Sequence, residues 1–334
     1  MPDQDGPRAT PLLSVVVPAY DEEAVLPLLA GRLRPVLDVL GIDYEVVLVD
    51  DGSRDLTAAV ALGLRREWPE LRLVRLRVNA GHQAALSAGL RRAQGAYMVT
   101  IDADLQDPPE TIAEMLRIAR SEELDVVYGV RSDRSTDGAF KRGTAGAFYR
   151  LLGLLTGGAA PLHAGDFRLM SRATVDAINT LPESGRVLRF VVPALGYPSA
   201  SVGYRREARS AGRSKYGLWH MVRLSLDSIT AVSVAPLRLA TVTGLLGGLV
   251  AVLVGVVTLT AHWAGHTLPG WTSTVAIVSG FSALQLICLG IVGEYLGRTY
   301  TFLQQWPAYS VAFDSDDPAT TARVEASVPA RSDS

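Results

Sequence analysis

The sequence has a single cysteine, Cys288, among its 334 residues. One cysteine forms no disulfide within the chain, and no ladder of Cys and His residues predicts a structural zinc site. The chain is not basic either, since 32 Lys and Arg residues face 34 Asp and Glu residues, for a formal net charge of −2. This balance argues against a general nucleic-acid-binding surface. Because 48% of the residues are hydrophobic, a chain without a folded core is also excluded.

Charged residues are absent from one long stretch, since no Asp, Glu, Lys or Arg occurs within 239–293. The apolar run Leu239–Leu259 would rise about 31 Å as a helix, which is the thickness of the hydrocarbon core of a bilayer. A second apolar run covers Ser273–Gly293, and a short loop with two Trp residues lies between the runs. We therefore expect two transmembrane helices within residues 237–298. The alternative, two buried helices of a soluble core, is disfavoured because such helices rarely lack a charged face over this length.

Arginines flank the two apolar runs. Arg238 precedes the first run and Arg298 follows the second, whereas the connecting loop has no Lys or Arg. The positive-inside rule then places both ends of the pair in the cytoplasm. The polar, acidic start of the chain predicts no signal peptide. We expect a multi-pass protein of the cell membrane (inner or plasma membrane), with the large N-terminal domain and both termini cytoplasmic.

A basic stretch precedes the first apolar run. Between Arg205 and Arg223 there are six Lys or Arg residues and one acidic residue. Such a stretch is suited to anionic lipid headgroups or to a substrate phosphate. The mixture of glycine, hydroxyl and cations in Gly212–Tyr216 favours phosphate, with juxtamembrane anchoring as the alternative. We expect an amphipathic helix at the membrane interface over residues 217–236.

Three segments are expected to lie outside the folded domains. Residues 1–11 are expected to be disordered, and residues 299–310 to form a cytosolic juxtamembrane segment. The tail 311–334 is acidic and rich in Ser, Ala and Pro, and we expect it to be disordered.

Residues 12–216 alternate apolar runs with amphipathic segments. Continuous apolar runs predict strands at Leu12–Val17, Tyr44–Val49, Leu71–Leu76, Tyr97–Ile101 and Asp125–Tyr128. Helical spacing predicts helices at Glu22–Leu40, Leu56–Trp68, Gln83–Ala93 and Glu110–Glu123. This alternation predicts an α/β fold with a mostly parallel sheet covered by helices.

Polar, acidic and glycine residues follow the predicted strands. Parallel sheets bind ligands at the carboxyl ends of their strands, so we expect the functional site there. The candidates are Pro18, Tyr20, Glu22, Asp50, Asp51, Gly81, Asp102, Asp104, Gln106 and Arg131.

Asp102 and Asp104 are the strongest candidates. On an extended chain, side chains at positions i and i+2 point the same way, and two neighbouring carboxylates repel unless a cation lies between them. Mg²⁺ or Mn²⁺ held by one or two carboxylates and by substrate phosphates is the usual arrangement. The alternative is an ordinary Asp-rich turn.

Two other strand ends have a nucleotide interpretation. One carboxylate of the pair Asp50 and Asp51 is expected to accept a hydrogen bond from a ribose or a base, and a helix-entry turn is the alternative. Gly81 precedes a predicted helix whose N–H groups are expected to face phosphate, although a turn glycine explains it as well.

Together these residues resemble glycosyltransferase family 2, which has the GT-A fold. More narrowly, the chain resembles the polyprenyl-phosphate glycosyltransferases, the dolichyl-phosphate mannosyltransferase and bactoprenol glucosyltransferase group. The matching pieces are Val17–Glu22 (VPAYDE), Asp50–Ser53 (DDGS), Asn79–Leu86 (NAGHQAAL), Asp102–Glu110 (DADLQDPPE), Gly212–Tyr216 (GRSKY) and Ile291–Arg298 (IVGEYLGR). The resemblance covers roughly residues 12 to 310, so it implies a GT-A catalytic domain over 12–216.

The resemblance implies transfer of a sugar from a nucleotide-diphosphate sugar (UDP- or GDP-linked) to polyprenyl phosphate, with inversion at the anomeric carbon. It also implies a homo-oligomer. Several roles follow residue by residue. Asp102, Asp104 and Gln106 would hold Mg²⁺ or Mn²⁺, whereas Pro18, Tyr20, Glu22, Asp50, Asp51 and Gly81 would bind the nucleotide sugar. Arg131, Arg134, Arg213, Ser214 and Lys215 would contact phosphate, mainly that of the acceptor.

Asp166 occupies the region where family members that act on hydroxyls carry a general base. A phosphate monoester is largely ionised at pH 7 and is itself the nucleophile, so a dedicated base is dispensable. We interpret Asp166 as an orienting residue or a partner for Arg168, and keep it among the catalytic candidates with Asp102, Asp104 and Arg131.

Three other functions are alternatives to this interpretation. A processive polysaccharide synthase acting on a hydroxyl should show a Q-x-x-R-W segment and more membrane spans, and the sequence has neither. A sugar nucleotidyltransferase should have a Gly-rich, Arg-containing loop after its first strand, whereas this chain has Pro-Ala-Tyr-Asp-Glu at Pro18–Glu22. A non-catalytic membrane scaffold would tolerate loss of Asp102 or Asp104, and both residues are present.

Overall fold

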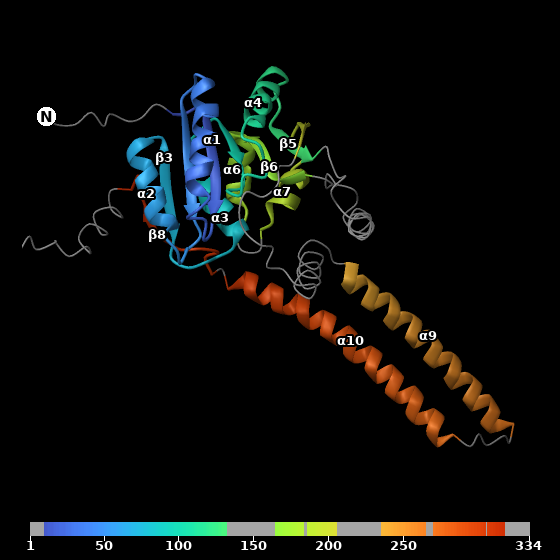
Figure 1. The fold of residues 1–334 in the computed structure, drawn as a ribbon. Helices are drawn as coiled ribbons and strands as arrows, with labels where there is room; N and C mark the ends of the chain where they lie inside the picture. Colours follow the sequence, from blue (N-terminus) through green and yellow to red (C-terminus); the bar gives the residue numbers. More distant parts are fainter. Residues whose placement is uncertain are drawn as a thin grey trace, which may run out of the picture. The chain divides into compact units, whose positions relative to one another are not determined.

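The structure is a computed structural model that describes residues 10–131, 164–183, 186–205, 235–264, 270–304 and 306–317 (Figure 1). The chain divides into two compact units. One unit comprises Met1–Lys215 together with Pro307–Ser334, and the other comprises Tyr216–Trp306. The first unit is therefore discontinuous in sequence, because the chain returns to it after the second.

The first unit is built on an eight-stranded sheet in the order β7-β5-β6-β4-β1-β2-β3-β8. Six of these strands run in one direction, and β6 and β8 run in the other. The strands are β1 (Leu13–Ala19), β2 (Tyr44–Asp50), β3 (Leu71–Leu76), β4 (Tyr97–Thr100), β5 (Val126–Arg131), β6 (Ala164–Ser171), β7 (Ser199–Tyr204) and β8 (Val311–Asp314). The predicted α/β fold with a mostly parallel sheet is confirmed.

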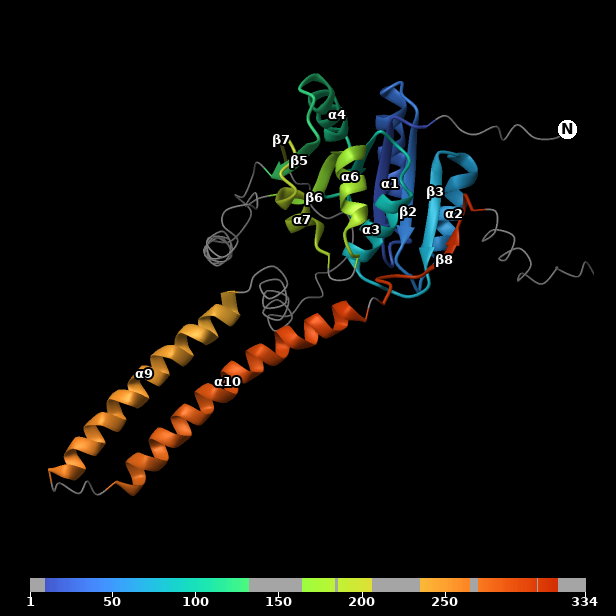
Figure 2. The ribbon, with the colours of Figure 1, turned by 180° about the vertical axis from the view of Figure 1, so that it is seen from behind.

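Helices cover both faces of this sheet, as the opposite views in Figures 1 and 2 show. On one face a hydrophobic cluster joins the sheet to α1 (Leu26–Val39), α2 (Thr57–Glu67) and α4 (Thr111–Ser121). On the other face a second cluster joins it to α3 (His82–Arg92), α6 (Arg172–Thr180) and α7 (Leu188–Ala194). The sheet thus lies between two helical layers.

The sequence pattern explains why these elements form. All seven residues of β1 are buried, as its continuous apolar run predicts for a central strand. Helix α1 has a proline in its first turn and buries Leu26, Leu29, Leu33 and Leu37, which share one face. Burial of each of these leucine side chains stabilises the fold by about 1.5–3 kcal/mol.

All five predicted strands and four predicted helices occur within a few residues of their expected bounds. Strands β6, β7 and β8 and helices α6 and α7 were not predicted. Strand β6 matters most for the site, because it runs antiparallel between β4 and β5. Its first residues consequently lie beside the last residues of β4.

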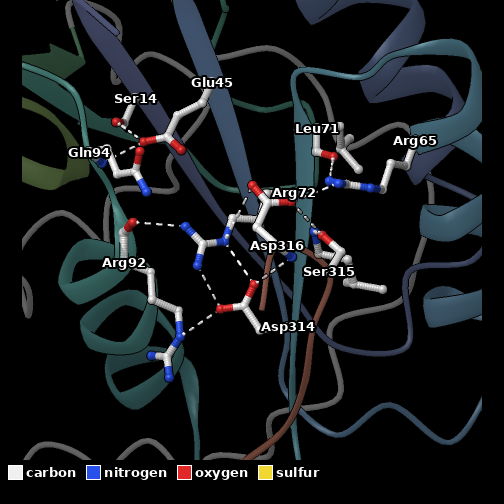
Figure 3. Close-up of polar contacts among 11 residues, drawn as sticks. Ser14, Glu45, Arg65, Leu71, Arg72, Arg92, Gln94, Asp314, Ser315 and Asp316 are labelled. Atoms are coloured by element: carbon white, nitrogen blue, oxygen red, sulfur yellow. Dashed lines mark hydrogen bonds and ion pairs between the residues drawn. The ribbon is translucent and has the colours of Figure 1, made fainter. Parts of the chain in front are cut away.

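The start of the C-terminal tail corrects one prediction. We expected disorder over 311–334, but Val311–Asp314 forms β8 and pairs antiparallel with β3. The cause is a buried ion pair: Asp314 accepts two hydrogen bonds of 2.8 Å from Arg72, and Arg92 Nε lies 3.2 Å from the same carboxylate (Figure 3). The tail as a whole is acidic and rich in Ser, Ala and Pro, so its composition does not indicate a strand at its start.

The second unit contains two long helices, α9 (Ala235–Trp263) and α10 (Trp271–Leu303). They pack antiparallel, since Ala240 and Thr243 of α9 contact Cys288 of α10, whereas Gly247 lies next to Phe281. Small residues along one face of α9 permit this close approach.

The apolar runs of these two helices match the predicted membrane spans only in part. Within the residues that the structure describes, α10 alone is long and apolar enough to cross a membrane, over Gly280–Gly297, and α9 has a shorter apolar run over Ala240–Val254. Helix α10 also ends at Leu303, five residues beyond the predicted membrane domain 237–298 and inside the predicted juxtamembrane segment 299–310. The predicted interfacial helix falls almost wholly on residues 206–234, outside the described part of the chain.

Candidate functional site

The candidate site lies where β4 ends and β6 begins. Thr100, the last residue of β4, pairs with Arg168 of β6, and its hydroxyl donates a hydrogen bond to the backbone carbonyl of Asp166. The antiparallel course of β6 therefore brings Asp166 to the edge of the sheet where the predicted metal residues Asp102 and Asp104 follow β4.

Asp166 is at the centre of a polar cluster, and its side chain is only 11% exposed. Oδ1 lies 3.0 Å from Nη2 of Arg168, which is itself fully buried. Oδ2 lies 3.3 Å from Nε2 of His82, 3.2 Å from Nε2 of Gln83 and 3.5 Å from Nη2 of Arg189. The predicted partnership between Asp166 and Arg168 is confirmed.

These contacts set the protonation of the cluster. Burial alone would raise the pKa of Asp166, but the hydrogen bond from His82 and the charges of Arg168 and Arg189 lower that pKa well below its ordinary value. Burial alone would lower the pKa of His82, whereas the hydrogen bond to Asp166 and the charge of Asp102 raise it overall. Asp166 is therefore a stable carboxylate and a weak base.

Asp102 and Asp104 lie in a turn rather than on the strand. Strand β4 ends at Thr100, and Leu105 has a left-handed backbone with φ of 59°. The extended-chain argument for the orientation of the two side chains therefore does not apply. Burial and the nearby carboxylates, Asp107 foremost, raise the pKa of Asp102 to about 6, although His82 at 3.7 Å opposes the shift.

The residues of this turn fit a hard divalent cation. Gln106 Oε1 is buried and accepts no hydrogen bond within the described residues. Burial first, and then the nearby carboxylates Asp107, Asp166 and Asp104, raise the pKa of Asp102, and a bound cation would favour its charged form. No three His, Cys, Asp or Glu side chains of the described chain form a cluster that could hold a metal. The protein would then supply one or two carboxylates, and substrate phosphates the remaining ligands.

The loops after β1 and β2 hold each other in place. The backbone N–H groups of Asp21 and Glu22 donate to Ser53 and Thr57, which lie beyond β2. Pro18 is buried in β1, whereas the side chain of Tyr20 is 37% exposed. Tyr20 and Glu22 thus lie at the strand ends, where the nucleotide was predicted to bind.

Asp50 and Asp51 make contacts within the protein. Asp50 is fully buried; its Oδ1 accepts from Ser53 N–H at 2.9 Å, and its Oδ2 lies 3.1 Å from Nε of Arg75. The two oxygens of Asp51 accept from the N–H groups of Ala80 and Gly81 at 2.7 and 2.9 Å. Asp51 therefore fixes the loop before α3, and a direct contact of Asp50, Asp51 or Gly81 with a nucleotide stays a prediction.

Arg131, the last residue of β5, is exposed and paired in register with Tyr204 of β7. The hydroxyl of Tyr204 donates to Asp107 at 2.5 Å and also interacts with the side chain of Arg131. Tyr204 thus links the turn after β4 to a predicted phosphate ligand. The other predicted phosphate ligands, Arg134, Arg213, Ser214 and Lys215, lie outside the described residues.

Sequence reasoning assigned no role to His82, Gln83 or Arg189. His82 and Gln83 belong to the NAGHQAAL motif, but nothing in that motif shows that they face Asp166, because the antiparallel β6 was not predicted. Arg189 had a weak sequence signal as the lone cation within an otherwise apolar segment, Val187–Ala194.

Comparisons with known proteins point to one family. The family model described as Glycosyl transferase family 2 matches residues 14–178. The uncharacterized glycosyltransferase YkcC of Bacillus subtilis (strain 168) is 40% identical over 89% of this chain and 92% of its own length. A prophage bactoprenol glucosyl transferase homolog of Escherichia coli (strain K12) is 34% identical over 90% of this chain and 98% of its own.

Among solved structures, glucosyl-3-phosphoglycerate synthase from Mycobacterium tuberculosis, in complex with Mn²⁺, UDP and phosphoglyceric acid, is 21% identical to this chain. The TM-score is 0.49, with 66% of this chain and 77% of that chain covered.

Proposed function

The chain belongs to glycosyl transferase family 2 and is a glycosyltransferase, and we propose that it moves a hexose from a nucleotide-diphosphate sugar to polyprenyl phosphate. Two relatives support this acceptor: a prophage bactoprenol glucosyl transferase homolog of Escherichia coli and a prophage-derived bactoprenol glucosyl transferase of Shigella flexneri are each 34% identical over 90% of the chain. The product would be a lipid-linked sugar that serves as donor for glycoconjugate assembly.

The choice of acceptor rests on the low pKa of Asp166, which makes this residue a weak base. A hydroxyl acceptor needs a general base with a pKa near the working pH. Asp166 stands where such a base is expected, yet Arg168, Arg189 and His82 hold its pKa well below the ordinary value. A phosphate monoester needs no proton removed, because its second pKa is about 6. The geometry therefore favours a phosphate acceptor over a hydroxyl.

In the proposed reaction a phosphate oxygen of the lipid attacks the anomeric carbon of the sugar. The new C–O bond forms as the bond to the nucleoside diphosphate breaks, and the bonding electrons leave with the diphosphate. Attack from the opposite side inverts the configuration. No proton has to move at the protein.

Asp102, Asp104 and Gln106 would hold Mg²⁺ or Mn²⁺, which would neutralise the charge of the departing diphosphate. Tyr20 and Glu22 lie where the nucleotide would bind, and Asp50 and Asp51 hold the adjoining loops in place. Arg131 would contact the acceptor phosphate, together with residues of the basic stretch.

Helices α9 and α10 would form a pair of membrane spans. Their outward side chains are large and aliphatic, as at Leu246, Leu249, Leu286 and Leu289, and this favours a lipid environment over water. The arginine bias of the sequence supports a cytoplasmic position for both ends of the pair. A tag after Ser334 is expected to resist protease added outside intact cells and to be cleaved once the cells are opened.

The proposal is tested with membranes that contain the full-length protein, a panel of labelled UDP- and GDP-sugars, and polyprenyl phosphate. We expect one donor to yield a lipid-extractable product whose mass is that of polyprenyl phosphate plus one hexose. The same lipid with a free hydroxyl in place of the phosphate is the control acceptor. Equal transfer to the hydroxyl lipid would contradict the proposed acceptor, and no transfer from any donor would contradict the whole proposal.

A further inference from the structure

Arg189 is a half-exposed cation beside the site, and Asp166 is its carboxylate partner within the described residues. Its side chain is 41% exposed, and Nη2 lies 3.5 Å from Asp166 Oδ2, at the outer limit of a hydrogen bond. Nε is buried and has no hydrogen-bond partner within the described residues. A guanidinium has five N–H donors, so most of its capacity is available to a ligand.

Arg168 provides the comparison within the same cluster. It is fully buried, and its two terminal nitrogens donate to the carbonyls of Leu188 and Gly165 at 2.9 Å and to Asp166 at 3.0 Å. Arg168 therefore already neutralises Asp166. Arg189 also lowers the pKa of Asp166, but through a longer contact of 3.5 Å, so its guanidinium keeps N–H donors for another anion.

The backbone that carries Arg189 is fixed from two directions. The N–H of Leu188 donates to Oε1 of Gln83 at 2.9 Å, and the carbonyl of Leu188 accepts from Arg168. Leu188 is itself buried. A long cationic side chain on an anchored backbone is pre-organised, which lowers the entropic cost of binding a ligand.

The neighbours of Arg189 indicate which anion would bind. It contacts the same carboxylate oxygen as His82, and His82 lies 3.7 Å from Asp102 of the predicted metal turn. A diphosphate held at that turn, or a monophosphate attacking beside it, would bring oxygens to this side of the site. Arginine binds such oxygens through two parallel N–H groups.

We infer that Arg189 is a phosphate-binding residue of the active site, contacting either the diphosphate of the sugar donor or the phosphate of the lipid acceptor. This inference rests on the proposed function. Arg189 of α7 would then be a further phosphate ligand. Helix α7 lies on the same face of the sheet as α3.

The test compares Arg189→Met with Arg91→Met in the full-length protein. Arg91 is a matched control, because it is 56% exposed and pairs with a single carboxylate, Glu183, at 3.1 Å. Loss of a hydrogen bond to a charged group predicts that Arg189→Met raises the KM for one substrate about ten- to a hundred-fold, while Arg91→Met leaves both KM values unchanged. Arg189→Lys should recover part of the loss.

The two KM values identify the source of the phosphate. A rise confined to the nucleotide sugar assigns Arg189 to the donor diphosphate, and a rise confined to polyprenyl phosphate assigns it to the acceptor. Binding of UDP or GDP, whichever matches the active donor, in the presence of Mn²⁺ should weaken only in the first case, as measured by calorimetry.

A purely structural role is distinguished in the background of Asp166→Asn. If Arg189 acted only by orienting Asp166, Arg189→Met would have no further effect in that background, and the inference would be overturned. Kinetics equal to those of Arg91→Met would overturn it as well. If the unmodified protein transfers no sugar from any donor, the proposed function fails, and the inference fails with it.

Discussion

Replacement of Asp314 by Asn should destabilise the first unit strongly. Asp314 and Arg72 form a two-hydrogen-bond pair at 2.8 Å, with side chains only 6% and 11% exposed. The amide cannot neutralise Arg72, whose guanidinium stays buried and keeps a longer, 4.0 Å contact with the carboxylate of Asp316. Removing one partner of such a pair costs about 3–5 kcal/mol, which corresponds to a fall in Tm of about 6–20 °C for a domain of this size.

A second arginine–carboxylate pair in the same unit serves as the control. Arg32 and Glu110 make the same two-hydrogen-bond contact at 2.8 Å, but their side chains are 29% and 53% exposed. Exposed pairs contribute about 0.2–1 kcal/mol, so Glu110→Gln should lower Tm by less than about 4 °C. Thermal unfolding of the detergent-solubilised protein measures both variants. Equal shifts would refute the argument that burial decides the strength of the pair.

The same variant has a pH signature. Burial alone would raise the pKa of Asp314, but the hydrogen bonds and charges of Arg72 and Arg92 lower it below its ordinary value. A carboxyl with a lowered pKa stabilises the folded state above its unfolded pKa of about 4, and this contribution is lost as the pH falls further. The Tm difference between the unmodified protein and Asp314→Asn should therefore be constant from pH 7 down to about 5 and shrink below about 4.

Three further predictions concern the site. Asp104→Ala should abolish metal-dependent transfer without lowering Tm by more than a few degrees, and unchanged turnover in the presence of a chelator would disprove the metal role. Because the pKa of Asp102 is about 6, the affinity for Mn²⁺ should fall up to about ten-fold per pH unit below that value, as protons compete with the metal; a flat titration from pH 7 to 5 would contradict this. Tyr204→Phe removes the link between Asp107 and Arg131 and should raise the KM for polyprenyl phosphate several-fold, with a smaller effect on the nucleotide sugar.

Local patterns predicted five of the six strands that run in one direction, β1 to β5, and most of the strand-end residues. The apolar run of β1 and the leucine spacing of α1 each specify one element without reference to the rest of the chain. The antiparallel β6 was beyond such reasoning, since its segment AGDFRLMS has no simple alternation and its neighbours are set by long-range pairing. The cluster around Asp166 depends on that pairing, so the roles of His82 and Arg189 could not be read from spacing.

For strand β8, the sequence predicted disorder where the structure has an ordered strand. Composition predicted disorder for the tail, because its acidic residues appear unpaired in the sequence. Asp314 is paired with arginines more than two hundred residues earlier, and no local pattern records a contact at that separation. Charge composition describes a segment's average behaviour, whereas the placement of one buried carboxylate depends on the whole fold.

The interrupted first unit has a consequence for biosynthesis. The ribosome translates both long helices before it reaches β8. Until then, the outer edge of β3 has no partner strand, and Arg72 has no ion pair with Asp314. Exposed strand edges invite pairing with other chains. Completion of the sheet is thus coupled to synthesis of the segment from Tyr216 to Trp306, and a gene truncated before that segment would yield an aggregation-prone product rather than a free-standing enzyme.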